Sequence, residues 1–116
     1  MSTIKNHVQL IGNVGQEPTI TNLESGKKVV RFSIATNEHY KNNKGEKVQT
    51  TDWHTIVAWG KTADIVEQFV GKGKEIAVTG KLRTRSYTTD DGNQRYVTEV
   101  EIKEVLLLAG KSDKSA

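Results

Sequence analysis

The chain has 116 residues, which is enough for one domain with a hydrophobic core and too few for two. Lys and Arg outnumber Asp and Glu by 17 to 14, a balance that allows an anionic partner without requiring one. The absence of cysteine excludes disulfides, thiolate metal sites and cysteine nucleophiles. The mixed polar and apolar N-terminus argues against export, and the longest apolar run, residues 105–109, is far shorter than a membrane helix. We therefore expect one cytoplasmic domain over residues 1–110, with no membrane contact, and a short disordered tail over 111–116.

Along most of the chain, apolar and polar residues alternate, which is the period of a strand with one buried face. Residues 8–14 and 30–34 show this period, and the turn-forming residues 24–27 lie between them. A third strand over residues 48–59 follows a polar hairpin connection at 41–46. The first half of the chain therefore predicts three strands.

The period changes over residues 65–70, where apolar side chains recur at helical spacing. We expect a short helix there, with Thr62 as its N-cap and Gly71 as its C′ residue. Alternation then returns in a fourth strand over 76–87 and a fifth over 94–108. The order β-β-β-α-β-β predicts an all-β fold, the five-stranded Greek-key barrel called the OB-fold, with its helix between strands three and four.

The fourth strand carries its charges on one face. Period two places Lys81, Arg83, Arg85 and Tyr87 together, opposite the apolar face. Like charges side by side repel one another, and a purely structural surface more often has acids among them, as the fifth strand has with Glu99. Taken alone, this basic stripe also fits an ordinary solvated strand face.

Two tryptophans share one face of the third strand, because Trp53 and Trp59 are six residues apart. A large aromatic is more often part of the core, and the neighbouring Val57 agrees with that reading. The second and fourth strands already supply an aliphatic core, however, and a small barrel has little room for two indoles. We therefore expect both rings to be exposed.

Exposed aromatics among Lys and Arg suit a single nucleic-acid strand, because unpaired bases stack on the rings while the cations neutralise phosphates. Every base has a π-face, so binding of this kind ignores sequence, and a duplex hides those faces. Single-stranded DNA binding is our first hypothesis. An OB-fold assembly factor that binds a protein or a structured RNA through the same face stays open, as does, more weakly, a nuclease or other enzyme on this fold.

Four segments in register resemble the bacterial single-stranded DNA-binding proteins: residues 8–18, 32–36, 52–61 and 79–87, which read VQLIGNVGQEP, FSIAT, DWHTIVAWGK and TGKLRTRSY. The resemblance covers nearly the whole chain. It implies a homotetramer of OB-folds that protects single strands in replication, recombination and repair, associated with the nucleoid. It also implies that the protein is not an enzyme and has no cofactor.

The resemblance also assigns residues. Base-stacking aromatics would be Tyr40, Trp53, Trp59 and Tyr87. Phosphate-binding cations would be Lys61, Lys72, Arg83 and Arg85, to which the stripe adds Lys81. His54 would lie at a subunit interface, whereas His7 and Thr55 stand where relatives are often basic. Two positions that are often tryptophan in the family are tyrosine here, which predicts weaker stacking.

Other signals are weak. Relatives commonly end in an acidic tip that recruits replication proteins, whereas residues 111–116 read KSDKSA, so we expect no recruitment through them. Gly60-Lys61-Thr62 resembles the end of a P-loop but lacks its first glycine. The histidines at 7, 39 and 54 are not spaced as zinc ligands, so we expect no metal.

Overall fold

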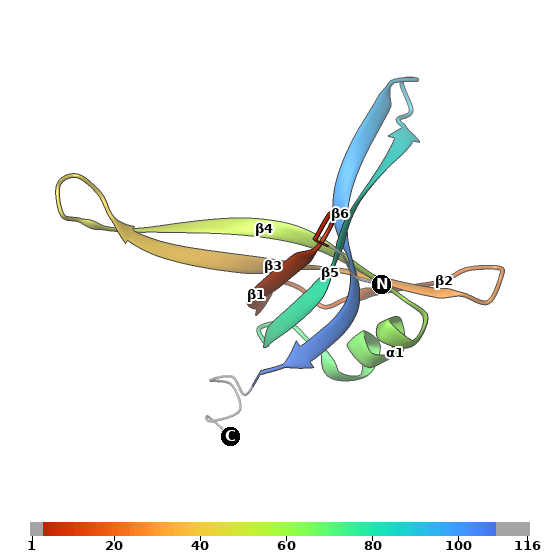
Figure 1. Cartoon of the computed structure of the whole chain (residues 1–116). Helices are drawn as coiled ribbons and strands as arrows, with labels where there is room; N and C mark the ends of the chain where they lie inside the picture. The colour runs from red at the N-terminus through yellow and green to blue at the C-terminus, as the bar shows by residue number, and fades with distance from the viewer. Residues whose placement is uncertain (1–3, 109–116) are drawn as a thin grey trace.

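A computed structural model describes residues 4–108 as six strands and one helix (Figure 1). The elements in chain order are β1 (Val8–Val14), β2 (Thr19–Asn22), β3 (Lys28–Lys41), β4 (Lys47–Trp59), α1 (Gly60–Phe69), β5 (Glu75–Thr88) and β6 (Gln94–Leu107). The tail expected over residues 111–116 lies outside the described residues.

Five of the strands close into a barrel. They follow one another in the order β1-β5-β6-β4-β3, and β3 returns to β1 through the pairs Ala35–Asn13 and Ile34–Val14. Neighbouring strands run antiparallel except β4 and β6, which meet in a short parallel contact. The remaining strand, β2, extends the edge of β3. The all-β barrel with its helix between β4 and β5 is the predicted architecture, so that prediction is confirmed.

The core lies inside this barrel and is almost entirely aliphatic. Alternate residues of the strands point inward, and α1 closes one end with Ala63 and Val66, which are fully buried. The largest fully buried side chains are Ile34, Ile56, Ile76, Val30, Val66 and Val78. The strand faces predicted from period two are therefore correct for the barrel.

Two inward-facing glycines let strands approach closely at the barrel corners. A Cβ on Gly12 would overlap the carbonyl oxygen of Ala35, and a Cβ on Gly80 would overlap that of Glu101. Gly80 also lies where the β5–β6 register shifts. Glycine at these places allows the strands to bend around a small core.

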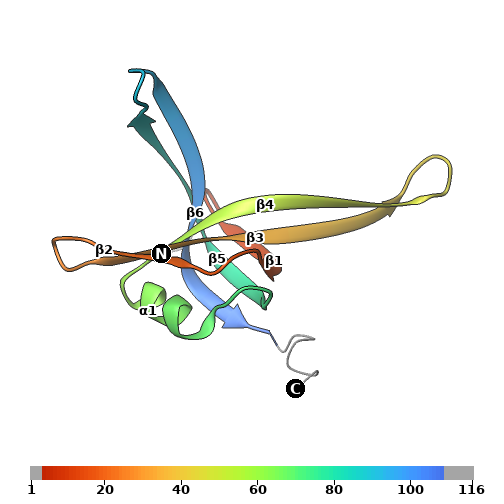
Figure 2. The same ribbon diagram turned by 180° about the vertical axis from the view of Figure 1, so that it is seen from behind.

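Two hairpins extend beyond the barrel as long arms, as both views show (Figures 1 and 2). In the β3–β4 arm, the carboxamide oxygen of Asn42 accepts hydrogen bonds from the N–H groups of Lys44 and Glu46, at 2.9 and 3.0 Å. In the β5–β6 arm, the carboxylate of Asp91 accepts hydrogen bonds from the Thr89 hydroxyl and the Asn93 N–H. Each arm is therefore closed by side chains of its own turn.

The helix differs from the prediction at its start. It begins at Gly60, because this glycine takes a φ of 60° that turns the chain directly out of β4. Trp59 occupies the N-cap position, so the prediction of Thr62 as N-cap is wrong, and the Thr62 hydroxyl instead donates to the Lys103 carbonyl at 3.3 Å. No helix within residues 4–108 is long and apolar enough to cross a membrane.

Candidate nucleic-acid interface

The two tryptophans of β4 lie on the outer face of the barrel. Trp53 is 62% exposed and Trp59 is 37% exposed, while Ala35 and Val29, which pair with them across β3, are buried. The rings therefore do not belong to the core. They present aromatic surface to solvent on the face opposite the buried Ile56.

Trp53 also has a fixed support. A Cβ on Gly15, just after β1, would overlap the six-membered ring of the indole, and it would lie 3.2 Å from the Ser33 hydroxyl oxygen. The ring therefore rests against the backbone of Gly15. A ring held in this way loses little conformational freedom when a ligand stacks on it.

The two tyrosines that the sequence predicts as stacking residues lie one on each arm. Tyr87, on β5, is half-exposed and shares the outer face with the basic stripe. Tyr40, on β3, lines a shallow groove with Lys41 and Lys47, but it pairs with Val48 and so lies on the face of the arm opposite Trp53. The structure thus does not bring all four rings to one face. A strand that used them all would have to pass around the edge of the β3–β4 arm.

The basic stripe is not free of acids. On β6, Glu101 lies opposite Lys81 and Glu99 opposite Arg83 in the strand register. The Glu101 carboxylate is 3.9 Å from the Lys81 Nζ and 3.6 Å from the Arg83 Nη1. The sequence pattern did not indicate these cross-strand carboxylates, because period two gives the face of a residue and not its cross-strand neighbour.

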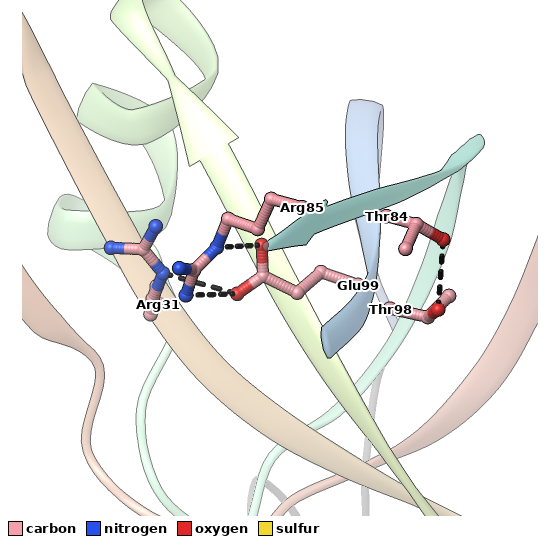
Figure 3. A network of polar contacts seen from close by, with 5 residues as sticks. All are labelled: Arg31, Thr84, Arg85, Thr98 and Glu99. Carbon is pink, nitrogen blue, oxygen red and sulfur yellow. Dashed lines mark hydrogen bonds and ion pairs between the residues drawn. The ribbon is translucent and has the colours of Figure 1, made fainter. Parts of the chain in front are cut away.

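The third stripe residue belongs to a group that we call the arginine cluster: Arg31 of β3, Arg85 of β5 and Glu99 of β6 (Figure 3). Arg85 donates from Nε to Glu99 Oε1 at 3.2 Å and from Nη2 to Oε2 at 3.3 Å. Arg31 donates from Nε to the same Oε2 at 3.3 Å. The Glu99 side chain is only 7% exposed, so its carboxylate is enclosed by the two guanidinium groups.

All three groups of the cluster are charged at neutral pH. Burial alone raises the pKa of Glu99, but the hydrogen bonds from Arg85 and Arg31, together with the positive charges of these residues, outweigh it, so this pKa lies below its usual value. The hydrogen bond to Glu99 likewise raises the pKa of Arg85. Two guanidinium charges and one carboxylate leave the cluster with a net charge of +1.

The remaining predicted cations lie apart from the stripe. Lys61 is in the first turn of α1, two residues after Trp59, and Lys72 is in the loop beyond the far end of the helix. The backbone N–H of Lys72 donates to Glu17 at 3.2 Å. Both lysines are exposed. They would meet a bound strand on the α1 side of the barrel.

His54 is half-buried, and its Nε2 lies 2.9 Å from the Thr36 hydroxyl oxygen. No group of three or more His, Cys, Asp or Glu side chains that could hold a metal occurs among the residues the structure describes. Sequence reasoning did not single out Arg31 as a site residue, nor Tyr96, which is largely exposed on the other face of the β5–β6 arm. Arg31 lies between the apolar Val30 and Phe32, so the period of two puts it on the opposite, outward face, which is the available signal.

Comparisons with known proteins agree with this geometry. Residues 5–108 match the model of the "Single-strand binding protein family". The chain is 41% identical over 111 residues to Single-stranded DNA-binding protein 1 of Xylella fastidiosa, and 40% identical over 107 residues to the protein of that name from Chlorobaculum tepidum. These matches cover 95% and 91% of this chain, and 82% and 66% of the relatives.

A solved structure is similar over nearly its whole length. It is the Plasmodium falciparum SSB complex with ssDNA, which superposes with a TM-score of 0.83 at 34% identity. The match covers 93% of this chain and 98% of that one. Sequence and fold agree over the same residues, and the chain belongs to the single-strand binding protein family.

Proposed function

We propose that this chain binds single-stranded DNA without reading its sequence and is not an enzyme. The observation that carries the proposal is the exposure of Trp53 and Trp59 on a barrel face that also holds the basic stripe. The names of its relatives and the DNA-bound state of the Plasmodium structure support it. Its role is the protection of exposed strands in replication, recombination and repair, in the cytoplasm and at the nucleoid.

Each proposed residue has one of two tasks. Bases stack on the aromatic rings, at about 1 to 3 kcal/mol per base, and cations neutralise phosphates in a manner that weakens with salt. The stacking residues are Tyr40, Trp53, Trp59 and Tyr87. The cations are Lys61, Lys72, Lys81, Arg83 and Arg85. The partial pairing of Lys81 and Arg83 with Glu101 is loose and exposed, so both can turn to a phosphate.

The test is a titration of the intrinsic tryptophan fluorescence with oligothymidylate at two salt concentrations, with a duplex of the same length as control. We expect strong quenching by the single strand, weaker apparent affinity at the higher salt, and little response to the duplex. An unchanged fluorescence with no competition by oligothymidylate would instead favour an assembly factor whose indoles bind a protein or a structured RNA.

We further propose that the chain forms a homotetramer around which a strand wraps. Among the described residues, Val8–Gly12 of β1 pairs with β5 alone, so one edge of this strand is open to a second copy. Beside this open edge, the exposed apolar side chains of Ile11 and Leu106 lie in one row that crosses the outer face of β1, β5 and β6. Linked sites raise affinity through effective concentration.

Size-exclusion chromatography with light scattering tests the assembly. A tetramer is expected at micromolar protein, and a clean monomer would remove the wrapping proposal. Replacement of His54, which the resemblance assigns to the subunit interface, is expected to shift the population toward smaller species without loss of the barrel.

A further inference from the structure

We infer that the arginine cluster is a preformed site for a backbone phosphate, in which Arg31 binds the phosphate together with Arg85 and Glu99 positions both. The inference rests on the proposed function and adds two residues to it. Arg31 becomes a phosphate-binding residue. Glu99 becomes a positioning residue that acts through the two arginines.

The cluster lies between the aromatic positions of the outer face. Arg31 pairs with Val57 on β4, and Val57 pairs with Glu101 on β6, so the Arg31 side chain reaches across β4 to meet Glu99. On the same face of β4, Trp59 is two residues beyond Val57, and on β5, Tyr87 is two residues beyond Arg85. A strand that stacked on both rings would carry its backbone past the cluster.

The guanidinium groups keep donors for an anion. Arg31 reaches Glu99 through Nε, which leaves the N–H groups of both terminal nitrogens, and Arg85 uses Nε and Nη2, which leaves Nη1. The Arg31 side chain is 38% exposed and that of Arg85 49%, so these donors reach solvent. Planar forks of this kind match the oxygens of a phosphate.

Glu99 explains how two like charges can be held side by side. Without a carboxylate between them the guanidinium groups would repel and separate, and each would have to be ordered again when a phosphate binds. Because Glu99 is enclosed and bonded by three N–H groups, both arginines are fixed in advance while a net positive charge remains. Rigid placement of binding groups lowers the cost of association.

Glu101 provides a matched control. It lies two residues from Glu99 on the same strand and face, but it is 28% exposed and its ion pairs with Lys81 and Arg83 are longer, at 3.9 and 3.6 Å. Glu99→Gln and Glu101→Gln each remove one negative charge from the same surface. A purely electrostatic effect is therefore the same for both variants, whereas positioning affects only the first.

The decisive measurement is the affinity of each variant for oligothymidylate in the fluorescence titration. We expect Glu101→Gln to bind at least as tightly as wild type, and Glu99→Gln to bind about 3- to 10-fold more weakly, although it has gained positive charge, because hydrogen bonds to charged groups are lost. Affinity of Glu99→Gln equal to or above that of wild type would overturn the inference.

Arg31→Gln tests the site without touching the buried acid, in case Glu99→Gln does not fold. We expect a loss of affinity of similar size and a salt slope, log K against log salt, that is shallower by about 0.7, the value for one single-strand phosphate contact. The double variant with Glu99→Gln should lose little more than either alone. A purely structural role would lower the melting temperature and leave the slope unchanged, which would contradict the inference.

The two proposals fail in different ways. If oligothymidylate does not quench the tryptophan fluorescence of wild type, both the proposed function and this inference are wrong. If wild type binds and Arg31→Gln binds equally well with the same salt slope, only the inference fails.

Discussion

The two faces of β4 differ in their largest side chains, although Val57 on the outer face is buried like the residues inside. On the inner face Ile56 and Ala58 are fully buried, while on the outer face Trp53 and Trp59 keep much of their surface exposed. The larger and more apolar side chains are thus the ones outside. A barrel of this size fills its core with aliphatic residues from its inward faces, so the exposed surface of the indoles remains available for a ligand.

Substitutions on the inner face are expected to affect stability and to leave affinity unchanged. Ile56→Ala should lower the free energy of unfolding by about 2 to 5 kcal/mol, because it leaves a cavity in the core. Chemical denaturation measures this loss, and affinity of the folded fraction for oligothymidylate should stay close to that of wild type. If Ile56→Ala had normal stability and bound oligothymidylate poorly, the inner face would contribute to binding and the two faces would not differ in function.

The outer face is expected to determine affinity. Trp53→Ala and Trp59→Ala should each weaken oligothymidylate binding by about 1 to 3 kcal/mol, because one stacking surface is lost. Quenching of the remaining indole measures this change, and Tyr96→Ala, which removes an exposed ring from the other face of an arm, is the control that should bind normally. If both tryptophan variants instead lose as much stability as Ile56→Ala, the indoles are core residues.

The arginine cluster is a place where the outer face should also affect stability, and the pH dependence of the melting temperature tests this. The folded-state pKa of Glu99 is lowered, so its contribution is present above the ordinary carboxyl pKa of about 4.3 and is lost as the pH falls through the folded value. The melting temperature of wild type should therefore exceed that of Glu99→Gln at pH 7, and the difference should shrink below about pH 4. A difference that is independent of pH from 7 to 3 would show that the Glu99 charge is not involved.

The smallest effect is expected at Arg83, the most exposed cation of the stripe. Arg83→Ala should make the salt slope shallower by about 0.7 and leave stability nearly unchanged, because its pair with Glu101 is exposed. Lys27→Ala, in the turn before β3, removes the same charge away from this surface and is the control. Equal slopes for the two variants would mean that net charge, not the position of Arg83, governs binding.

Strand faces were readable from sequence because burial on one side imposes a period of two. The inward residues of β3, such as Val30 and Ile34, followed from that period. The outward position of Trp53 needed a second argument, the limited room inside a small barrel. The start of α1 could not be predicted from this period. Thr62 is a good capping residue, and the alternation of apolar residues does not indicate the positive φ of Gly60. Strand β2 has four exposed residues, and an edge strand without a buried face gives no alternation to detect.

The environment of the charged residues could not be read in the same way. Sequence placed Arg85 and Arg31 on outward faces, but the ion pairs depend on which strands become neighbours and in which register. Arg31 and Glu99 are 68 residues apart and belong to strands that do not pair with each other. The support of Trp53 by Gly15 is likewise a contact between residues far apart in the sequence.

The barrel is closed by two short seams, of two residue pairs each between β1 and β3 and between β4 and β6. The β3–β4 and β5–β6 hairpins, by contrast, are long ladders between segments adjacent in sequence. Local ladders form quickly, whereas the seams require distant parts of the chain to meet, so we expect closure to be the late step of folding. In the native state the same seams are where amide hydrogens should exchange first among the barrel strands, ahead of the hairpin ladders on either side.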